Sequence, residues 1–161
     1  MNTKFEFVDG DTIEFNGTTL RRIRALRDIP EFNVKAGRLG GYLEKEENLS
    51  SNGSCWVSGE ALVFGEAWVF GEAWVSDKAR VFDKAWVSDK ALVFGKARVF
   101  GKALVFGKAW VFGEALVFGK ALVFGDARVS GEALVFGEAR VSGKDALMML
   151  ARSHEKKAAA K

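Results

Sequence analysis

The chain has 161 residues, a formal net charge of +3 and 48% hydrophobic residues. This length is typical of one domain, and so small a positive charge gives no reason to expect nucleic-acid binding. The single cysteine excludes an internal disulfide framework. The N-terminal residues lack the basic region and long apolar run of a signal peptide. No stretch is long and apolar enough to cross a membrane, so we expect a cytoplasmic protein.

Residues 1–52 are non-repetitive and predict a small β cap followed by the coil that leads into the repeats. The segments KFEFV (4–8) and TIEF (12–15) alternate apolar and polar residues as strands do, around turn residues at 9–11. TLRRIRAL (19–26) is compatible with a third strand or a short helix, which Pro30 would end. Residues 33–50 contain three glycines and a charge cluster and are interpreted as the connection into the repeats.

Residues 53–142 consist of fifteen hexads without an insertion. Each hexad has Gly or Asp first, Ala third (Cys55 in the first hexad), Val fifth, and Phe or Ser sixth. Ala and Val two residues apart point to the same side of a strand, and Gly or Asp permits the turn that follows. A period of six leaves room only for a short strand and a turn. Three such strand–turn units close a triangular coil of about eighteen residues. The repeat therefore predicts a solenoid of about five coils.

Residues 143–161 change in character, because good helix formers replace Gly and the β-branched residues. Leu147 and Leu150 share one face at helical spacing. We expect a helix over 145–157 that covers the last coil with Leu147, Met148 and Leu150. Caps at both ends of the solenoid would hide the strand edges that otherwise invite polymerisation.

The spacing V-x-G-x-A-x, as in Val57 with Ala61, resembles the hexapeptide repeat of left-handed β-helices, the fold of bacterial acyltransferases. VKAGRLGGYLEKEENLS followed by GSCWVSGEA is similar to the start of the repeats in the YdcK-like β-helix proteins of bacteria and phages. This resemblance covers nearly the whole chain up to residue 142. It implies an all-β, single-stranded left-handed β-helix. The relatives often carry Asn after the turn glycine, where this chain has Glu, Lys or Asp, and Ser54 in the first hexad.

Residues eighteen apart would stack on one another, which gathers the aromatic side chains into columns. If Ala and Val fill the interior, these aromatics face outward, and stacking hides only part of each ring. A contiguous apolar surface of this kind is typical of an interface. The candidate interface consists of Phe64, Phe82, Phe100, Phe118, Phe136, Trp56, Trp74 and Trp110. We expect a homodimer or homotrimer; the alternatives are a docking surface for another protein, tight ladder packing in a monomer, or a reversal of inside and outside.

The second hexad position is Glu in the first coils, Lys in the middle coils and mixed afterwards. The candidate basic belt consists of Lys84, Lys102, Arg80 and Arg98. These side chains are compatible with solvated corner residues, with an anion-binding belt, or with a basic band that meets the acidic band of a second copy and sets the register of an oligomer.

Acyltransferases of this fold depend on a histidine base, but the repeat contains no histidine. His154 lies in the predicted C-terminal helix, and one Cys with one His cannot build a zinc site. Cys55 occupies an Ala position, so we expect a small buried hydrophobe. We therefore expect no catalytic residues, cofactor or metal, and a non-catalytic structural or interaction protein that self-associates through aromatic faces. The alternatives are a binding module or inhibitor that docks on another macromolecule and, remotely, an acyltransferase-like enzyme.

Overall fold

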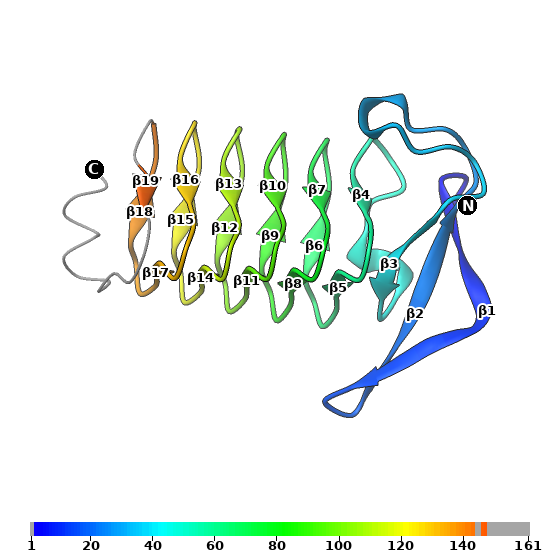
Figure 1. The fold of residues 1–161 in the computed structure, drawn as a ribbon. Coiled ribbons are helices and arrows are strands. Elements are labelled where there is room, and N and C mark those ends of the chain that lie inside the picture. Colours follow the sequence, from blue (N-terminus) through cyan, green and yellow to red (C-terminus); the bar gives the residue numbers. More distant parts are fainter. Residues whose placement is uncertain (1, 144–145, 148–161) are drawn as a thin grey trace.

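The computed structural model describes residues 2–143 and 146–147. Over these residues the chain is an all-β solenoid of about six coils, with a β-hairpin at its N-terminal end (Figure 1). The expected solenoid is thus confirmed. The additional coil lies within residues 1–52, where β3 (Leu39–Leu43) stacks on the first repeat strands.

Three sheets run along the solenoid, one on each side of the triangular coil. The eight-stranded sheet contains the hairpin strands, β3 and the repeat strands β5 (Leu62–Val63), β8 (Arg80–Val81), β11 (Arg98–Val99), β14 (Leu116–Val117) and β17 (Leu134–Val135). The six-stranded sheet contains β4 (Trp56–Val57), β7 (Trp74–Val75), β10 (Leu92–Val93), β13 (Trp110–Val111), β16 (Arg128–Val129) and β19 (Ala146–Leu147). The five-stranded sheet contains β6 (Trp68–Val69), β9 (Trp86–Val87), β12 (Leu104–Val105), β15 (Leu122–Val123) and β18 (Arg140–Val141).

Each repeat strand pairs in parallel with the strand eighteen residues later, so that Trp86, Leu104 and Leu122 lie in one row. The Ala and Val of every hexad are buried, and Cys55 takes the place of one Ala in the same core. The expected orientation, with small aliphatic side chains inside and aromatic side chains outside, is therefore confirmed for the repeat.

The corners of the coil need a left-handed backbone, which explains the restriction to Gly and Asp at the first hexad position. Gly101 has a φ of 69°, and the three aspartates Asp77, Asp83 and Asp89 have φ values of 60°, 61° and 57°. Each aspartate carboxylate also accepts a hydrogen bond from the backbone N–H of the glycine one coil later, at 3.0 Å. Asp is therefore tolerated at these corners, because its carboxylate accepts a hydrogen bond from a backbone amide that the pairing between the strands leaves free.

The N-terminal cap is built differently from the expectation. β1 runs without interruption over Phe5–Phe15, and the hairpin turn is at Asn16–Gly17, where both φ values are positive (50° and 79°). Such a pair of residues is typical of a two-residue hairpin turn. The turn expected at 9–11 is wrong: Gly10 lies instead in the irregularity of pairing between Phe7 and Thr12. β2 (Thr18–Ala25) is a strand, which settles the alternative between strand and helix.

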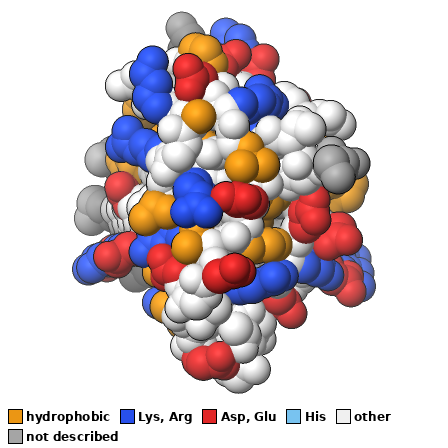
Figure 2. Space-filling view, turned by 90° about the vertical axis from the view of Figure 1, so that its right-hand side faces the viewer, with side chains coloured by type: hydrophobic (Ala, Val, Ile, Leu, Met, Phe, Trp, Pro, Cys, Tyr) orange, Lys and Arg blue, Asp and Glu red, His pale blue; other side chains and the backbone are white. Residues whose placement is uncertain are grey.

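The cap closes one end of the solenoid in two ways. β3 pairs antiparallel with β2 and parallel with β5, so the hairpin continues the eight-stranded sheet. The connection that follows β2 contains the short helix η1 (Pro30–Phe32), and Phe5, Ile23, Ile29 and Val34 join the core of the repeat. Viewed from this end, charged side chains of both signs cover the surface and hydrophobic side chains form only separate small patches (Figure 2).

At the other end the solenoid continues beyond the fifteenth hexad. Ala146 and Leu147 form β19 and pair in parallel with Arg128 and Val129 of β16. The expected helix over 145–157 is therefore wrong at these two residues, because Leu147 stands six residues after Val141 and keeps the register of the repeat. The rest of that helix, including Met148, Leu150 and His154, lies outside the described residues.

Candidate interaction surface

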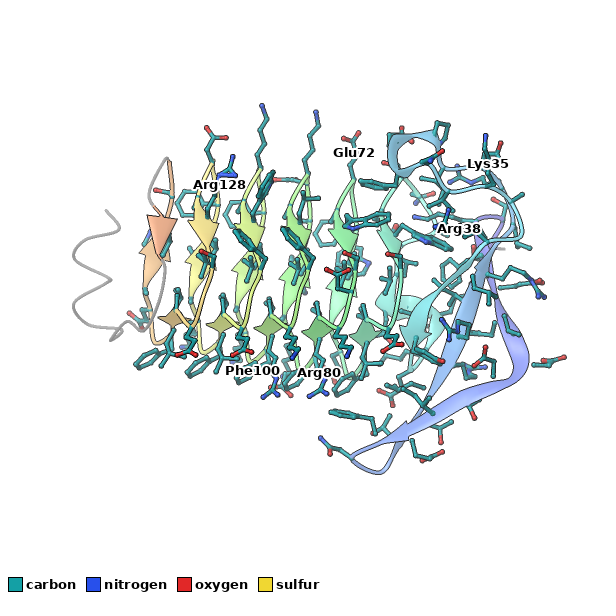
Figure 3. The ribbon with its side chains drawn as sticks, viewed as in Figure 1. Lys35, Arg38, Glu72, Arg80, Phe100 and Arg128 are labelled. Carbon is teal, nitrogen blue, oxygen red and sulfur yellow. The ribbon has the colours of Figure 1, made fainter. Side chains whose placement is uncertain are left out.

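The expected phenylalanine column forms on the eight-stranded sheet. The successive rings of Phe64, Phe82, Phe100, Phe118 and Phe136 are 4.9–5.1 Å apart and parallel within 4°. Phe100 points away from the solenoid along the edge that also carries Arg80 (Figure 3). Because each ring face is covered by the next ring, these side chains are half-buried and present mainly their edges to solvent. The hairpin also covers the first ring, since Phe15 packs edge-on against Phe64 at 5.5 Å.

The expected tryptophan column on the six-stranded sheet is largely covered. Trp56 is fully buried, and a side-chain carbon on Gly40 would lie only 2.8 Å from its ring. Trp74 packs against Phe32 of η1 with ring centroids 4.6 Å apart. The guanidinium of Arg128 lies 3.9 Å from the ring centroid of Trp110. The prediction of Trp56 as an interface residue is therefore wrong, because the cap folds over it.

The most exposed aromatic side chains belong to the five-stranded sheet instead. Trp68 is 37% exposed and Trp86 is 44% exposed, whereas Trp56 is buried and Trp74 and Trp110 are half-buried. Leu104, Leu122 and the rings beside them continue an apolar face along this sheet, and Arg140 ends it. The sequence pattern does not indicate this face as the leading candidate, because all five tryptophans occupy the same hexad position.

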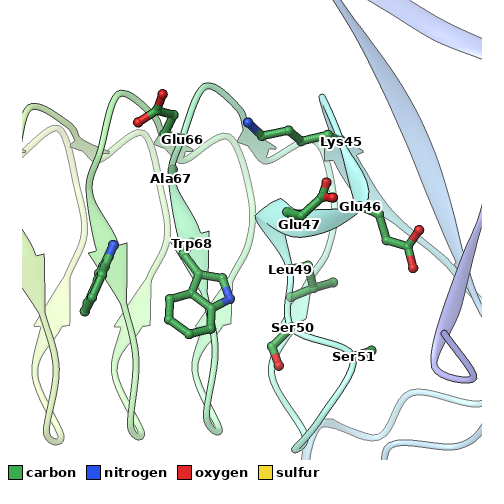
Figure 4. Close-up of a pocket in the computed structure, with 10 residues that line it drawn as sticks. Lys45, Glu46, Glu47, Leu49, Ser50, Ser51, Glu66, Ala67 and Trp68 are labelled. Atoms are coloured by element: carbon green, nitrogen blue, oxygen red, sulfur yellow. The ribbon is translucent and has the colours of Figure 1, made fainter. Parts of the chain in front are cut away.

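Trp68 and Trp86 border a hollow of about 660 Å³ where the five-stranded sheet meets the coil before the repeats. Their rings are perpendicular, with centroids 5.5 Å apart, and Trp68 also stacks on Phe70 at 3.9 Å. The opposite wall comes from the short helix η2 (Glu46–Asn48) and the segment that follows it. Figure 4 shows Trp68 beside Leu49 and Ser50, with Glu66 at the turn before Ala67.

The carboxylates around this hollow outnumber the cations. Glu46, Glu47 and Glu66 line it together with one cation, Lys45, and with the hydroxyl-bearing Ser50 and Ser51. The hollow exists because the coil before the repeats carries no aromatic side chain on this side, whereas the next two coils carry the tryptophans. Indole rings beside carboxylates make a surface suited to a cationic group.

The four cations of the expected basic belt lie on one side of the solenoid, but in two settings. Arg80 and Arg98 are in register on neighbouring strands of the eight-stranded sheet, and Lys84 and Lys102 are exposed at the next corner. The guanidinium of Arg80 lies 4.5 Å from the ring centroid of Phe15. Partial burial, and then the positive charge of Arg98, lower the pKa of Arg80. Within the described part of the chain, none of the four forms an ion pair.

Cys55 is buried, as expected, but it has a polar partner that the sequence pattern did not indicate. The buried ammonium of Lys4 donates hydrogen bonds to the carbonyl oxygen of Ser50 at 2.9 Å and to Sγ of Cys55 at 3.1 Å. Burial lowers the pKa of Lys4 and raises the pKa of the Cys55 thiol. A thiol held in its protonated form is a poor nucleophile, so this pair is suited to holding the cap on the first coil.

The described residues contain no group of three or more His, Cys, Asp or Glu side chains that could hold a metal ion. In the same part of the chain, no helix has the length and apolar character needed to cross a membrane. No protein-family model matches the sequence, and a comparison with the curated proteins found no match.

Proposed function

We propose that this protein is a non-catalytic scaffold that self-associates through the outer face of its five-stranded sheet. The observation that carries the proposal is the exposure of Trp68 and Trp86, at 37% and 44%, on a sheet whose neighbouring outer side chains are also apolar. Large aromatic side chains dominate the energetics of protein interfaces, because they bury much apolar area with little loss of conformational freedom.

The other two sheets offer less free apolar surface. Phe15 of the hairpin packs against Phe64 and Arg80 on the eight-stranded sheet, and stacking covers the remaining ring faces. On the six-stranded sheet, Phe32 and Arg128 lie over two of the tryptophans. The five-stranded sheet is therefore the face on which a second copy would remove most exposed aromatic surface from water.

A second candidate function is a binding module that docks an acidic macromolecule on the eight-stranded sheet. It is favoured by Arg80 and Arg98, which lie side by side and form no ion pair with any residue that the structure describes. Two adjacent like charges raise each other's electrostatic energy, and a carboxylate or phosphate placed between them would lower it. A pull-down from lysate that depends on Arg80 and Arg98, but not on Trp68 and Trp86, would favour this function over self-association.

Sedimentation velocity over a range of micromolar concentrations tests the proposal. The full chain is expected to form dimers or trimers as its concentration rises, whereas a Trp68→Ser/Trp86→Ser variant remains monomeric. The matched control is Phe100→Ser/Phe118→Ser, which removes two rings from the eight-stranded sheet and leaves self-association unchanged. A wild-type chain that stays monomeric, or a Trp variant that associates normally, would contradict the proposal.

A further inference from the structure

The hollow beside Trp68 and Trp86 has the chemistry of a receptor for a guanidinium group. Two indole rings meet at a right angle, and Glu47 and Glu66 line the hollow with them, together with the cation Lys45, whereas the carboxylate of Glu46 points away from Trp68 (Figure 4). Aromatic faces attract a cation through their quadrupole, and carboxylates accept hydrogen bonds from the planar fork of an arginine. The hollow is open and wide enough, at about 660 Å³, to admit a side chain from another molecule.

A guanidinium of this kind stands at the opposite end of the same sheet face. Arg140 is exposed on β18, in the row that runs through the five strands from Trp68 to Arg140. Its guanidinium lies 5.8 Å from the ring centroid of Phe124, near the outer limit of a cation–π contact. By contrast, Arg128 on the neighbouring sheet lies 3.9 Å from the ring centroid of Trp110. The fold thus already contains a close Arg–Trp pair of a type that Arg140 does not form with the described residues.

Two-fold symmetry brings these two ends together. The outward row reads Trp68, Trp86, Leu104, Leu122 and Arg140. Consider a two-fold axis that runs parallel to the strands, between the two copies and opposite Leu104. It reverses the order of the strands in the second copy. Leucine then faces leucine at the centre, and Arg140 of each copy faces Trp68 of the other. The distance from β6 to β18 is four strand spacings, roughly 19 Å, and is the same in both copies, so both contacts form together.

The charges at the corners do not distinguish this antiparallel arrangement from a parallel one, but the group placed opposite the hollow does. In the antiparallel arrangement Lys90 faces Asp126 on one rim, where Lys108 faces its own copy. On the other rim Glu66 faces Glu138, Lys84 faces Lys120 and Lys102 faces its own copy. In the parallel arrangement Glu66 faces Glu72, Lys84 faces Lys90 and Lys102 faces Lys108, so like charges meet on three successive levels. Like charges therefore meet in both arrangements, and only the antiparallel one places a guanidinium opposite the hollow.

We propose that the hollow lined by Trp68, Trp86 and Glu66 binds the guanidinium of Arg140 of the partner subunit in an antiparallel two-fold dimer. This inference rests on the proposed self-association and adds to it the residues that set its orientation. The occupant of the hollow is a second copy of this chain, and the interface contains two equivalent Arg–Trp contacts.

Charge reversal tests the contact itself. Arg140→Glu is expected to weaken the dimer roughly tenfold or more, since both contacts are lost at once. The double variant Arg140→Glu/Glu66→Arg restores the opposite charges across the interface and recovers part of the loss. Arg128→Glu, which changes the arginine on the neighbouring sheet, is the matched control and leaves the dimer unchanged. An Arg140→Glu chain that dimerises like the wild type overturns the inference.

Cross-linking tests the orientation separately. Cysteines replace exposed lysines outside the proposed contact, in a Cys55→Ala background, and a short bis-maleimide joins those that lie close together. The antiparallel dimer predicts cross-links when Lys84→Cys and Lys120→Cys chains are mixed, and none when Lys84→Cys and Lys90→Cys chains are mixed. The reverse result overturns the inference while leaving self-association intact, whereas a wild-type chain that is monomeric by sedimentation overturns the proposed function as well.

Discussion

The N-terminal cap and the hexapeptide repeat are stabilised by different kinds of contact. The repeat uses the same few contacts in every coil: buried Ala and Val, parallel ladders, and Gly or Asp corners. The cap depends on contacts that occur once, such as the hydrogen bonds from Arg22 to Tyr42 Oη at 2.7 Å and to the carbonyl oxygen of Gly40 at 2.9 Å. A repeat in which each unit contacts only its neighbours spreads its stability over many similar terms. We therefore expect single substitutions to be more damaging in the cap than in the repeat.

The largest effect is expected where the cap meets the first coils. A side-chain carbon on Gly41 would lie 2.7 Å from the carbonyl oxygen of Ala61 and 2.7 Å from Cγ1 of Val57. Gly41→Val must therefore displace β3 from β5, and we expect a loss of more than ~4 kcal/mol in the free energy of unfolding. Chemical denaturation measures it. Leu39→Val, on the same strand but exposed, is the control and should unfold like the wild type; similar stabilities for the two variants would contradict the account of the cap.

A smaller loss is expected from Lys4→Met. The variant removes the 2.9 Å hydrogen bond from the charged Lys4 to the carbonyl oxygen of Ser50 and leaves that oxygen only the weaker Cys55 thiol at 3.6 Å, so we expect a loss of about 1.5–3 kcal/mol. Burial lowers the pKa of Lys4, so above neutral pH the folded chain binds fewer protons than the unfolded chain. Stability of the Lys4-containing chain should then rise with pH, up to the range where an exposed lysine loses its proton.

The pH experiment is performed in a Cys55→Ala background, because the thiol titrates in a neighbouring range and its raised pKa acts in the opposite direction. Denaturant titrations at several pH values should show a positive slope for the Lys4 chain that is absent from Lys4→Met. Equal slopes in the two chains would show that Lys4 titrates like an exposed lysine.

The smallest effect is expected inside the repeat, at Asp83. Its carboxylate accepts a hydrogen bond from Gly101 N–H at 3.0 Å, and its backbone φ is 61°. Asp83→Ala loses the acceptor and keeps the unfavourable φ, so we expect a loss of about 1 kcal/mol. Asp83→Gly also loses the acceptor, but glycine adopts a positive φ without strain. Its stability should therefore lie close to that of the wild type. Thermal unfolding of both variants would contradict this account if Gly proved more damaging than Ala.

The repeat could be predicted from the sequence because one period fixes both the register and the buried positions. The cap could not be predicted in the same detail. Asn16–Gly17 is a strong hairpin signal, but residues 9–11 also have the composition of a turn. In the structure these three residues belong to β1, where the pairing with β2 is irregular. At the C-terminal end, helix propensity competed with the register of the repeat, and register determines the structure at Leu147.

The candidate surface was harder to predict than the fold, because a periodic sequence makes its three sheets look alike. Trp56 and Trp68 occupy the same position in their hexads, yet one is fully buried and the other is 37% exposed. The difference comes from the path of the cap, which passes over the six-stranded sheet with Phe32 and Gly40 and leaves the five-stranded sheet uncovered. No residue within the hexads themselves carries that information.

Hydroxyl-radical footprinting of the full chain, at concentrations below and above its association, tests the central claim most directly. We predict that oxidation of Trp68 and Trp86 falls sharply as the chain associates, while oxidation of Trp110 and Phe118 changes little. Associated chains in which Trp68 and Trp86 remain as reactive as in the dilute sample would contradict the claim that the five-stranded sheet is the face through which this protein assembles.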